Sequence, residues 1–117
     1  MAYIDGYLLA VAADKKADYL HFAQEAVQLF REQGALRVVE CWGDEVPEGK
    51  LTSMPMAVKC KDDEVVVFSW VEWPSKAVRD RGMQAVMQHP QMANAAQRMP
   101  FDGQRVIFGG FETLLDA

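Results

Sequence analysis

Charged and indole-bearing residues interrupt the apolar strand-like segments of this sequence. Carboxylates, a guanidinium and indoles in a partly dry cavity can orient a small planar or aromatic ligand, or hold a carboxylate whose pKa is raised. We therefore predict a candidate ligand pocket from five residues on predicted strands or their ends: Asp5, Trp42, Asp44, Trp70 and Arg105. The alternative is that these charges form salt bridges that fix the register of a dimer, without any ligand.

A second group of residues has the spacing of a metal site. Asp18, His21 and Glu25 stand at positions i, i+3 and i+7 of a predicted helix, where three side chains can ligate a divalent ion. The solvated edge of an amphipathic helix gives the same pattern, and the sequence contains neither HExxH nor paired CxxC motifs. We therefore predict no bound metal.

The sequence gives little support for a nucleophilic cysteine or for a nucleotide-binding site. Cys41 has no histidine or basic residue next to it in the sequence, so a buried cysteine that packs as a small apolar residue is expected. Gly109 and Gly110 lie inside a predicted strand and do not open a helix, which fits neither a dinucleotide fold nor a P-loop. We predict no cofactor.

The helices and strands that must position these residues are predicted from hydrophobic periodicity and from capping and turn-forming residues. Strands are predicted over residues 3–12, 36–46, 64–73 and 104–114. Helices are predicted from the N-cap Asp14 to the stop at Gly34, and from the N-cap Ser75 to Gln88, with a short helical turn over 91–98. This order predicts an α+β, ferredoxin-like βαββαβ fold, with a four-stranded antiparallel sheet and helices on one face. The first and third strands, which are the most continuously apolar, are expected in the centre of the sheet.

The residue pattern of the third predicted strand, residues 64–73, indicates that the helix-free face of the sheet is also covered. Val67 and Trp73 share one side of this strand, whereas Phe68 and Trp70 share the other, so both faces are apolar. A bare apolar face of this size is unusual for a monomer. We therefore predict a homodimer through the helix-free face, the arrangement of a dimeric α/β barrel. The alternative is that the C-terminal segment folds over this face.

Length, charge and composition limit the function classes. The 117 residues predict a single domain over 1–117, and half of them are apolar. Twelve basic against 17 acidic residues give a net charge of −5 without a basic cluster, which disfavours nucleic acid and membranes as partners. The apolar runs are too short for a bilayer span, and no signal peptide or disulfide framework is evident. These features predict a cytoplasmic protein.

Three long segments resemble a known family. They are residues 35–50 (ALRVVECWGDEVPEGK), 64–80 (EVVVFSWVEWPSKAVRD) and 99–112 (MPFDGQRVIFGGFE). Together they resemble the YbaA-like family of bacterial proteins of unknown function, in the dimeric α/β-barrel superfamily. The resemblance implies a ferredoxin-like fold and a dimer whose sheets pack face to face. It implies no particular reaction.

The wider superfamily that this resemblance indicates includes cofactor-independent quinol-type monooxygenases and haem-degrading enzymes. The positions nearest to the haem site would be His89, Trp70 and Asp5, but His89 precedes Pro90 and Asp5 is not an amide, so we expect no haem. We predict a non-catalytic, small-molecule-binding or stress-associated homodimer. The alternative is a cofactor-independent monooxygenase-like enzyme for a small aromatic or quinol substrate, with Asp5 or Asp44 as base.

Overall fold

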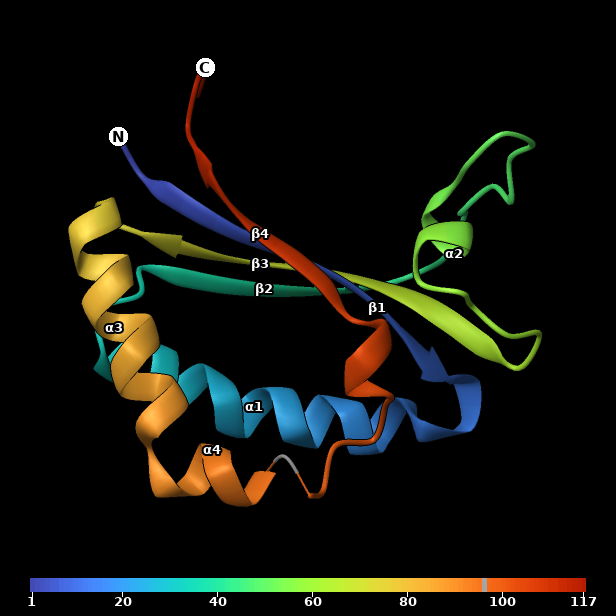
Figure 1. Cartoon of the computed structure of the whole chain (residues 1–117), viewed down its shortest axis with the longest axis horizontal. Coiled ribbons are helices and arrows are strands. Elements are labelled where there is room, and N and C mark those ends of the chain that lie inside the picture. The colour runs from blue at the N-terminus through green and yellow to red at the C-terminus, as the bar shows by residue number, and fades with distance from the viewer. Residues whose placement is uncertain (96) are drawn as a thin grey trace.

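The computed structural model describes residues 1–95 and 97–117 (Figure 1). Its strands and helices are β1 (Tyr3–Ala12), α1 (Lys16–Glu32), β2 (Arg37–Trp42), α2 (Met54–Ala57), β3 (Glu64–Trp73), α3 (Lys76–Gln88), α4 (Pro90–Ala95) and β4 (Ile107–Glu112). Single 3-10 turns lie at Ala13–Lys15 and Gly103–Arg105.

The four strands form one antiparallel sheet in the order β2-β3-β1-β4. The two most apolar strands, β1 and β3, are therefore central, as the sequence predicts. Helices α1, α3 and α4 lie on one side of the sheet, and the other side carries only α2 (Figure 1). This confirms the ferredoxin-like α+β fold.

Several helix ends confirm the predicted capping residues. The Ser75 side chain accepts a hydrogen bond from the Val78 amide at 3.2 Å and so begins α3. Gly34 follows α1 with a φ of +107°, in the left-handed region that ends many helices. Asp14, however, does not cap α1. It lies in a 3-10 turn, and the N-cap of α1 is Lys15 without a side-chain hydrogen bond.

Two strand boundaries and one helical segment differ from the prediction. β2 ends at Trp42 because the chain bends away from the sheet after Gly43. β4 begins only at Ile107, since the Asp102 side chain accepts from the Gln104 amide and closes a 3-10 turn instead. The helical turn predicted over 91–98 includes position 96, which lies outside the described residues, and α4 begins one residue earlier, at Pro90.

The core under the helices consists of two apolar clusters. One cluster gathers around Trp73, which is fully buried, and contains Leu29, Phe30, Ala35, Val71, Trp73 and Val86. The other lies toward the opposite end of the sheet and contains Leu9, Val11, Tyr19, Ala23 and Val67. β1 and β3 cross both clusters, so the residues between them occupy the centre of the helix-covered face.

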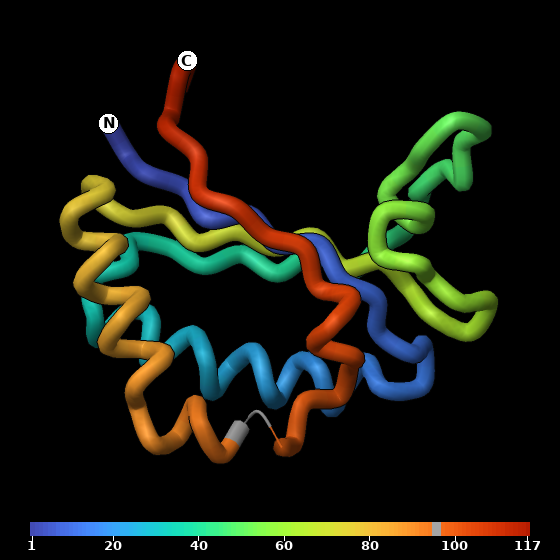
Figure 2. Tube along the Cα trace, viewed as in Figure 1, coloured from blue at the N-terminus to red at the C-terminus, as the bar shows by residue number. Residues whose placement is uncertain are grey.

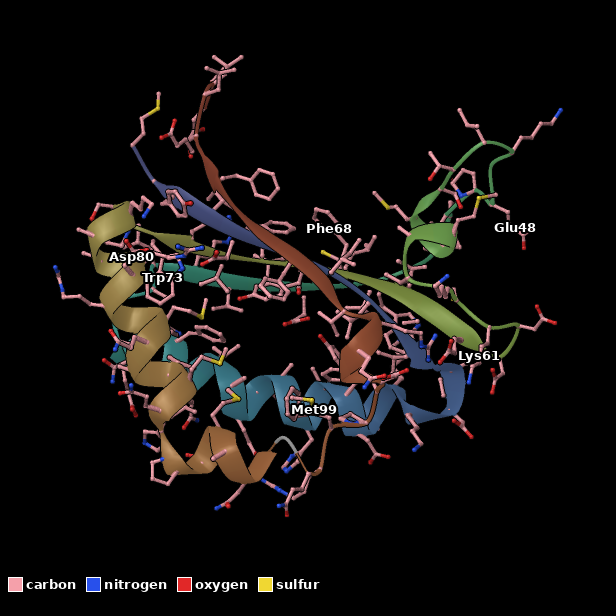
Figure 3. All side chains as sticks on the ribbon, viewed as in Figure 1. Glu48, Lys61, Phe68, Trp73, Asp80 and Met99 are labelled. Carbon is pink, nitrogen blue, oxygen red and sulfur yellow. The ribbon has the colours of Figure 1, made fainter. Side chains whose placement is uncertain are left out.

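The helix-free face of the sheet is apolar and exposed. Phe68, Ile107 and Phe111 are 43%, 44% and 60% exposed. Figure 3 shows Phe68 pointing away from the helices, whereas Trp73 points toward α3. Cys41 is also exposed, contrary to the buried position predicted for it, because it lies on this face of the edge strand β2.

Two segments rise from this same face (Figure 2). The arm, residues 43–63, connects β2 to β3 and contains α2, which Ser53 caps by accepting from the Met56 amide at 3.1 Å. Val58 of the arm is buried against Ala10 and Val66. The tail, residues 113–117, leaves β4 with Leu114 and Leu115 almost fully exposed, so the alternative that the C-terminal segment covers this face is wrong.

Candidate functional site

Asp5 lies on the helix-covered face, where its carboxylate is fully engaged. It accepts the Trp73 indole N–H at 2.9 Å and an N–H pair from Arg79, with Arg79 Nη2 at 2.9 Å. The guanidinium of Arg79 also stacks over the Tyr3 ring, 5.0 Å from its centre, and pairs with Asp80 at 2.8 Å. The Asp5 carboxylate is 94% buried and charge-compensated, so this residue joins α3 to the sheet rather than acting as an open base.

Arg105 is likewise committed to neighbouring residues. Its guanidinium binds Glu64 at 2.7 Å and Asp102 at 3.1 Å, and donates to the Lys59 carbonyl at 2.9 Å. Hydrogen bonds from Arg105 are the main reason that the pKa of Glu64 is lowered from 4.5 to about 2. Arg105 therefore fixes the base of the arm to the start of β3.

The remaining three predicted site residues lie in different places. Trp42 faces the helices beneath Lys16, whose ammonium lies 5.4 Å from the ring centre. Trp70 is on the helix-free face, 5.7 Å from Phe68 between ring centres. Asp44 lies at the start of the arm, where it lines an open groove of about 310 Å³ whose rim is charged and whose floor includes Val46.

The structure thus does not bring the five residues into one pocket. Directly paired residues of a sheet point to the same face, and Asp5 pairs with Val71, one position from Trp70. Asp5 and Trp70 consequently lie on opposite faces. The same separation means that Asp5, Trp70 and His89 do not fit a common haem pocket.

Two of the three helical residues considered for metal binding, His21 and Glu25, are tied into ion pairs. His21 contacts Glu25 at 3.1 Å, and Arg98 lies 3.7 Å from the same carboxylate. Within residues 1–95 and 97–117, no group of three or more histidine, cysteine or acidic side chains is arranged to hold a metal ion.

A row of chemically distinctive side chains crosses the centre of the helix-covered face. Glu40 of β2 pairs with Ser69 of β3, Ser69 with Tyr7 of β1, and Tyr7 with Phe108 of β4. We call these four residues the central row. It lies between the two apolar clusters: Val67 precedes Ser69 on this face of β3, and Val71 follows it.

The centre of this row is buried and its ends are open. Ser69 is 4% exposed, whereas Glu40 and Phe108 lie on the edge strands and are exposed. The Tyr19 hydroxyl of α1 donates to Glu40 Oε1 at 2.6 Å, and the Tyr7 and Phe108 rings stack with centres 6.1 Å apart. A carboxylate, hydroxyls and an aromatic face therefore line one strip of the sheet.

The surroundings shift the acid–base properties of this strip. The outer side of Glu40 is open, but partial desolvation of its carboxylate beside α1 raises its pKa, and the hydrogen bond from the Tyr19 hydroxyl offsets part of that increase. Burial also raises the pKa values of Tyr7 and Tyr19, and the nearby carboxylates Asp5 and Glu40 respectively add to the effect. Both phenols are neutral hydrogen-bond donors at physiological pH.

The pocket predicted from the sequence did not include Glu40, Tyr7, Ser69 or Tyr19. One signal was available. Ser69 is the polar residue in the middle of EVVVFSWVEW, on the side of β3 that also carries Val67 and Val71. A hydroxyl there interrupts an otherwise apolar face.

Comparison with known proteins places the chain in a family. Residues 2–103 match the model of the family described as Protein of unknown function (DUF1428). The chain belongs to this family. It is 53% identical over 116 residues to proteins of *Escherichia coli* K12 and *Shigella flexneri*, both named Uncharacterized protein YbaA, and the match covers 99% of each chain.

Solved structures are similar in fold. A crystal structure of an antibiotic biosynthesis monooxygenase has a TM-score of 0.55 at 11% identity, covering 98% of this chain and 100% of the other. Rv0793 from *Mycobacterium tuberculosis* has a TM-score of 0.54 at 12% identity, covering 100% and 99%. These likenesses establish the fold of this DUF1428 protein and not its activity. In the part of the chain that the structure describes, no helix has the length and apolar character needed to span a membrane.

Proposed function

We propose that this protein is a homodimer that binds a small aromatic molecule carrying a hydroxyl group, held over the central row beneath α1. One observation carries the proposal. Within residues 1–95 and 97–117, the Glu40 carboxylate is hydrogen-bonded to Tyr19 but forms no ion pair, and it shares its row with Ser69 and Tyr7. Asp5 and Arg105, by contrast, are occupied by strong partners.

The chemistry of the row suits a phenol or quinol. A ligand hydroxyl would donate to the carboxylate of Glu40 and accept from a neutral phenol, while its ring would lie over Ser69 toward Tyr7. Few convergent polar groups among apolar side chains are typical of small-molecule sites.

The homodimer follows from the helix-free face. Phe68 of β3 and Ile107 of β4 both pair with Leu8 of the strand between them, β1, so with Phe111 they expose an apolar surface that the tail leaves uncovered. Burial of this surface against a second copy would remove it from water. Light scattering at micromolar concentration should report about twice the chain mass of 13.2 kDa, and a mass of one chain would contradict this part of the proposal.

Ligand-observed NMR with a panel of mono- and dihydroxybenzenes tests the site. We expect at least one compound to bind, and Glu40→Gln and Ser69→Ala to weaken its binding about tenfold or more, since each removes a hydrogen-bonding group. Glu40 is exposed on the edge strand β2, and a glutamine there can still accept the hydrogen bond from Tyr19, so Glu40→Gln should change the free energy of unfolding by less than about 1 kcal/mol. This combination separates a binding residue from a structural one.

Asp44→Asn provides the matched control. It removes one carboxylate from the groove of the arm and leaves the central row unchanged. If Asp44→Asn abolishes binding and Glu40→Gln does not, the ligand lies in the arm and the assignment to the central row is wrong.

The alternative is a cofactor-independent, monooxygenase-like activity, which the fold likeness favours. Oxidation of an electron-rich phenol needs a base, and Glu40 rather than Asp5 would serve, since Asp5 is held by Arg79 and Trp73. An oxygen electrode separates the two functions. Oxygen uptake with a quinol that is lost in Glu40→Gln would support catalysis, whereas binding without consumption supports a carrier or sensor.

A further inference from the structure

The arm and the tail stand at opposite ends of the helix-free face. Glu112, the last residue of β4, pairs with Tyr3, so the tail leaves the sheet beside the start of β1. The arm rejoins the sheet at Glu64, which pairs with Ala12 at the end of β1. β1 has ten residues, which span about 33 Å. Both segments rise on the side away from α1 and α3 (Figure 2).

Each segment exposes apolar side chains. Leu51, Met54 and Met56 of the arm are 96%, 47% and 45% exposed, and Leu114 and Leu115 of the tail are 94% and 81% exposed. Opposite charges stand next to them in the chain: Lys50 precedes Leu51, and Asp116 follows Leu115.

The size of the sheet indicates that its face alone makes a small interface. Two strands of ten and two of six residues have a flat footprint of about 500 Å² at ordinary strand spacing, to which the relief of the side chains adds accessible area. A stable interface buries about 800 Å² on each partner. The arm and the tail are the apolar segments next to this face that can supply the difference.

Symmetry decides which segments meet. In a face-to-face dimer the two-fold axis lies between the sheets. An axis parallel to the strands would bring the two raised arms together at one end. An axis that crosses the strands instead reverses their direction and brings each tail to the end at which the arm of the other copy rises. Because the tail lies at the β4 edge and the arm on the β2–β3 side, this axis runs obliquely across the sheet, and the apolar side chains of the tail then meet those of the arm.

We propose, on the basis of the homodimer proposed above, that the tail of each protomer docks on the arm of a second copy. Leu114 and Leu115 then cover the apolar side chains of that arm, with Asp116 next to Lys50. The two exchanged contacts close both ends of the interface and set the relative direction of the two sheets.

Removal of the tail tests the energetic part of this proposal. A variant lacking residues 114–117 should have a dimer dissociation constant raised at least about tenfold in sedimentation equilibrium, because two leucines per protomer lose their buried positions. The matched control is Leu20→Ala combined with Met87→Ala, which shortens two exposed side chains on α1 and α3 and should leave the constant unchanged.

Crosslinking tests the geometry. In a Cys41→Ser, Cys60→Ser background, an isotope-labelled chain with Leu115→Cys is mixed with an unlabelled chain with Met56→Cys and oxidised. We expect disulfides between labelled and unlabelled chains, identified by mass spectrometry. Leu20→Cys in place of Met56→Cys should give none, since Leu20 lies on the helix-covered side.

The outcomes distinguish this inference from the proposed function. A wild-type monomer at micromolar concentration overturns both the dimer and the docking of the tail. A dimer that loses no affinity on truncation, or that crosslinks tail to tail instead of tail to arm, overturns the docking and leaves the homodimer standing.

Discussion

The two faces of the sheet carry opposite kinds of side chain at their centres. Under the helices, the central row presents a carboxylate, a serine hydroxyl and a phenol between two apolar clusters. On the helix-free face, the adjacent row is apolar throughout and consists of Cys41, Phe68, Leu8 and Ile107. Polar groups thus lie in the covered centre and apolar groups in the open one.

This inversion indicates different purposes for the two faces. A monomer gains no stability from exposed apolar side chains, and a buried hydroxyl adds little when an apolar residue would fit. In our proposals, the open face packs against a second copy and the covered face binds a small molecule. The first two predictions below compare the two faces through matched variants, and the last two test the contacts that hold α3 and the arm to the sheet.

The largest difference in the stability of the fold is expected between the variants Val67→Asp and Phe68→Asp. Val67 is 1% exposed in the core, and an unpaired charge there costs several kcal/mol, comparable to the whole stability of a small domain. Phe68, its neighbour on the other face, is 43% exposed in the protomer. We expect the first variant to unfold and the second to remain folded but monomeric, by circular dichroism and light scattering. A folded Val67→Asp protein would refute the assignment of faces.

The next largest difference is in the free energy of unfolding lost when a buried or an exposed ion pair is broken. Asp5→Ala leaves Arg79 without its buried partner and should lower the free energy of unfolding by about 3–5 kcal/mol. Glu72→Ala removes a 3.7 Å contact with the exposed Arg37 and should cost under about 1 kcal/mol. Urea denaturation measures both. Equal losses would show that the buried pair contributes no more than the exposed one.

A smaller effect tests the packing of α3 on the covered face. Gly82 is buried, and a Cβ there would lie 2.5 Å from the Trp73 ring and 2.8 Å from the Gln33 carbonyl oxygen. Gly-to-Ala substitutions within helices usually stabilise by up to about 1 kcal/mol. We expect Gly82→Ala to destabilise by about 1–3 kcal/mol instead, measured by thermal unfolding. A stabilised variant would mean that α3 is not held against Trp73.

The last effect is a pH dependence on the side of the arm. The pKa of Glu64 is lowered from 4.5 to about 2, chiefly by hydrogen bonds from Arg105. Its contribution to stability is therefore complete above pH 4.5 and is lost as the pH falls toward 2. In acid denaturation, Glu64→Gln should be less stable than the wild type at pH 6, with a difference that shrinks below pH 4. If the stability difference between the two proteins does not change with pH, the effect of Glu64→Gln is due to packing and not to the charge of Glu64.

Local signals in the sequence determined the order of the elements and the central place of β1 and β3. Alternation within β3 separated Val67 from Phe68 correctly, and Ser75 and Gly34 marked helix ends. Such features depend on residues a few positions apart, because strand period, helix period and capping are set by local backbone geometry. The same locality explains the failure at Asp14, where a 3-10 turn replaces the first helical turn.

The tertiary structure alone decided which polar residues meet. Asp5 finds Arg79 seventy-four positions away, and the central row requires the register of three strand pairs at once. A shift of one residue in any pair would turn its side chains to the other face. The sequence therefore named reactive residue types such as Asp5, Trp70 and Arg105, while register and helix docking separated these three and assembled Glu40, Ser69 and Tyr7 instead.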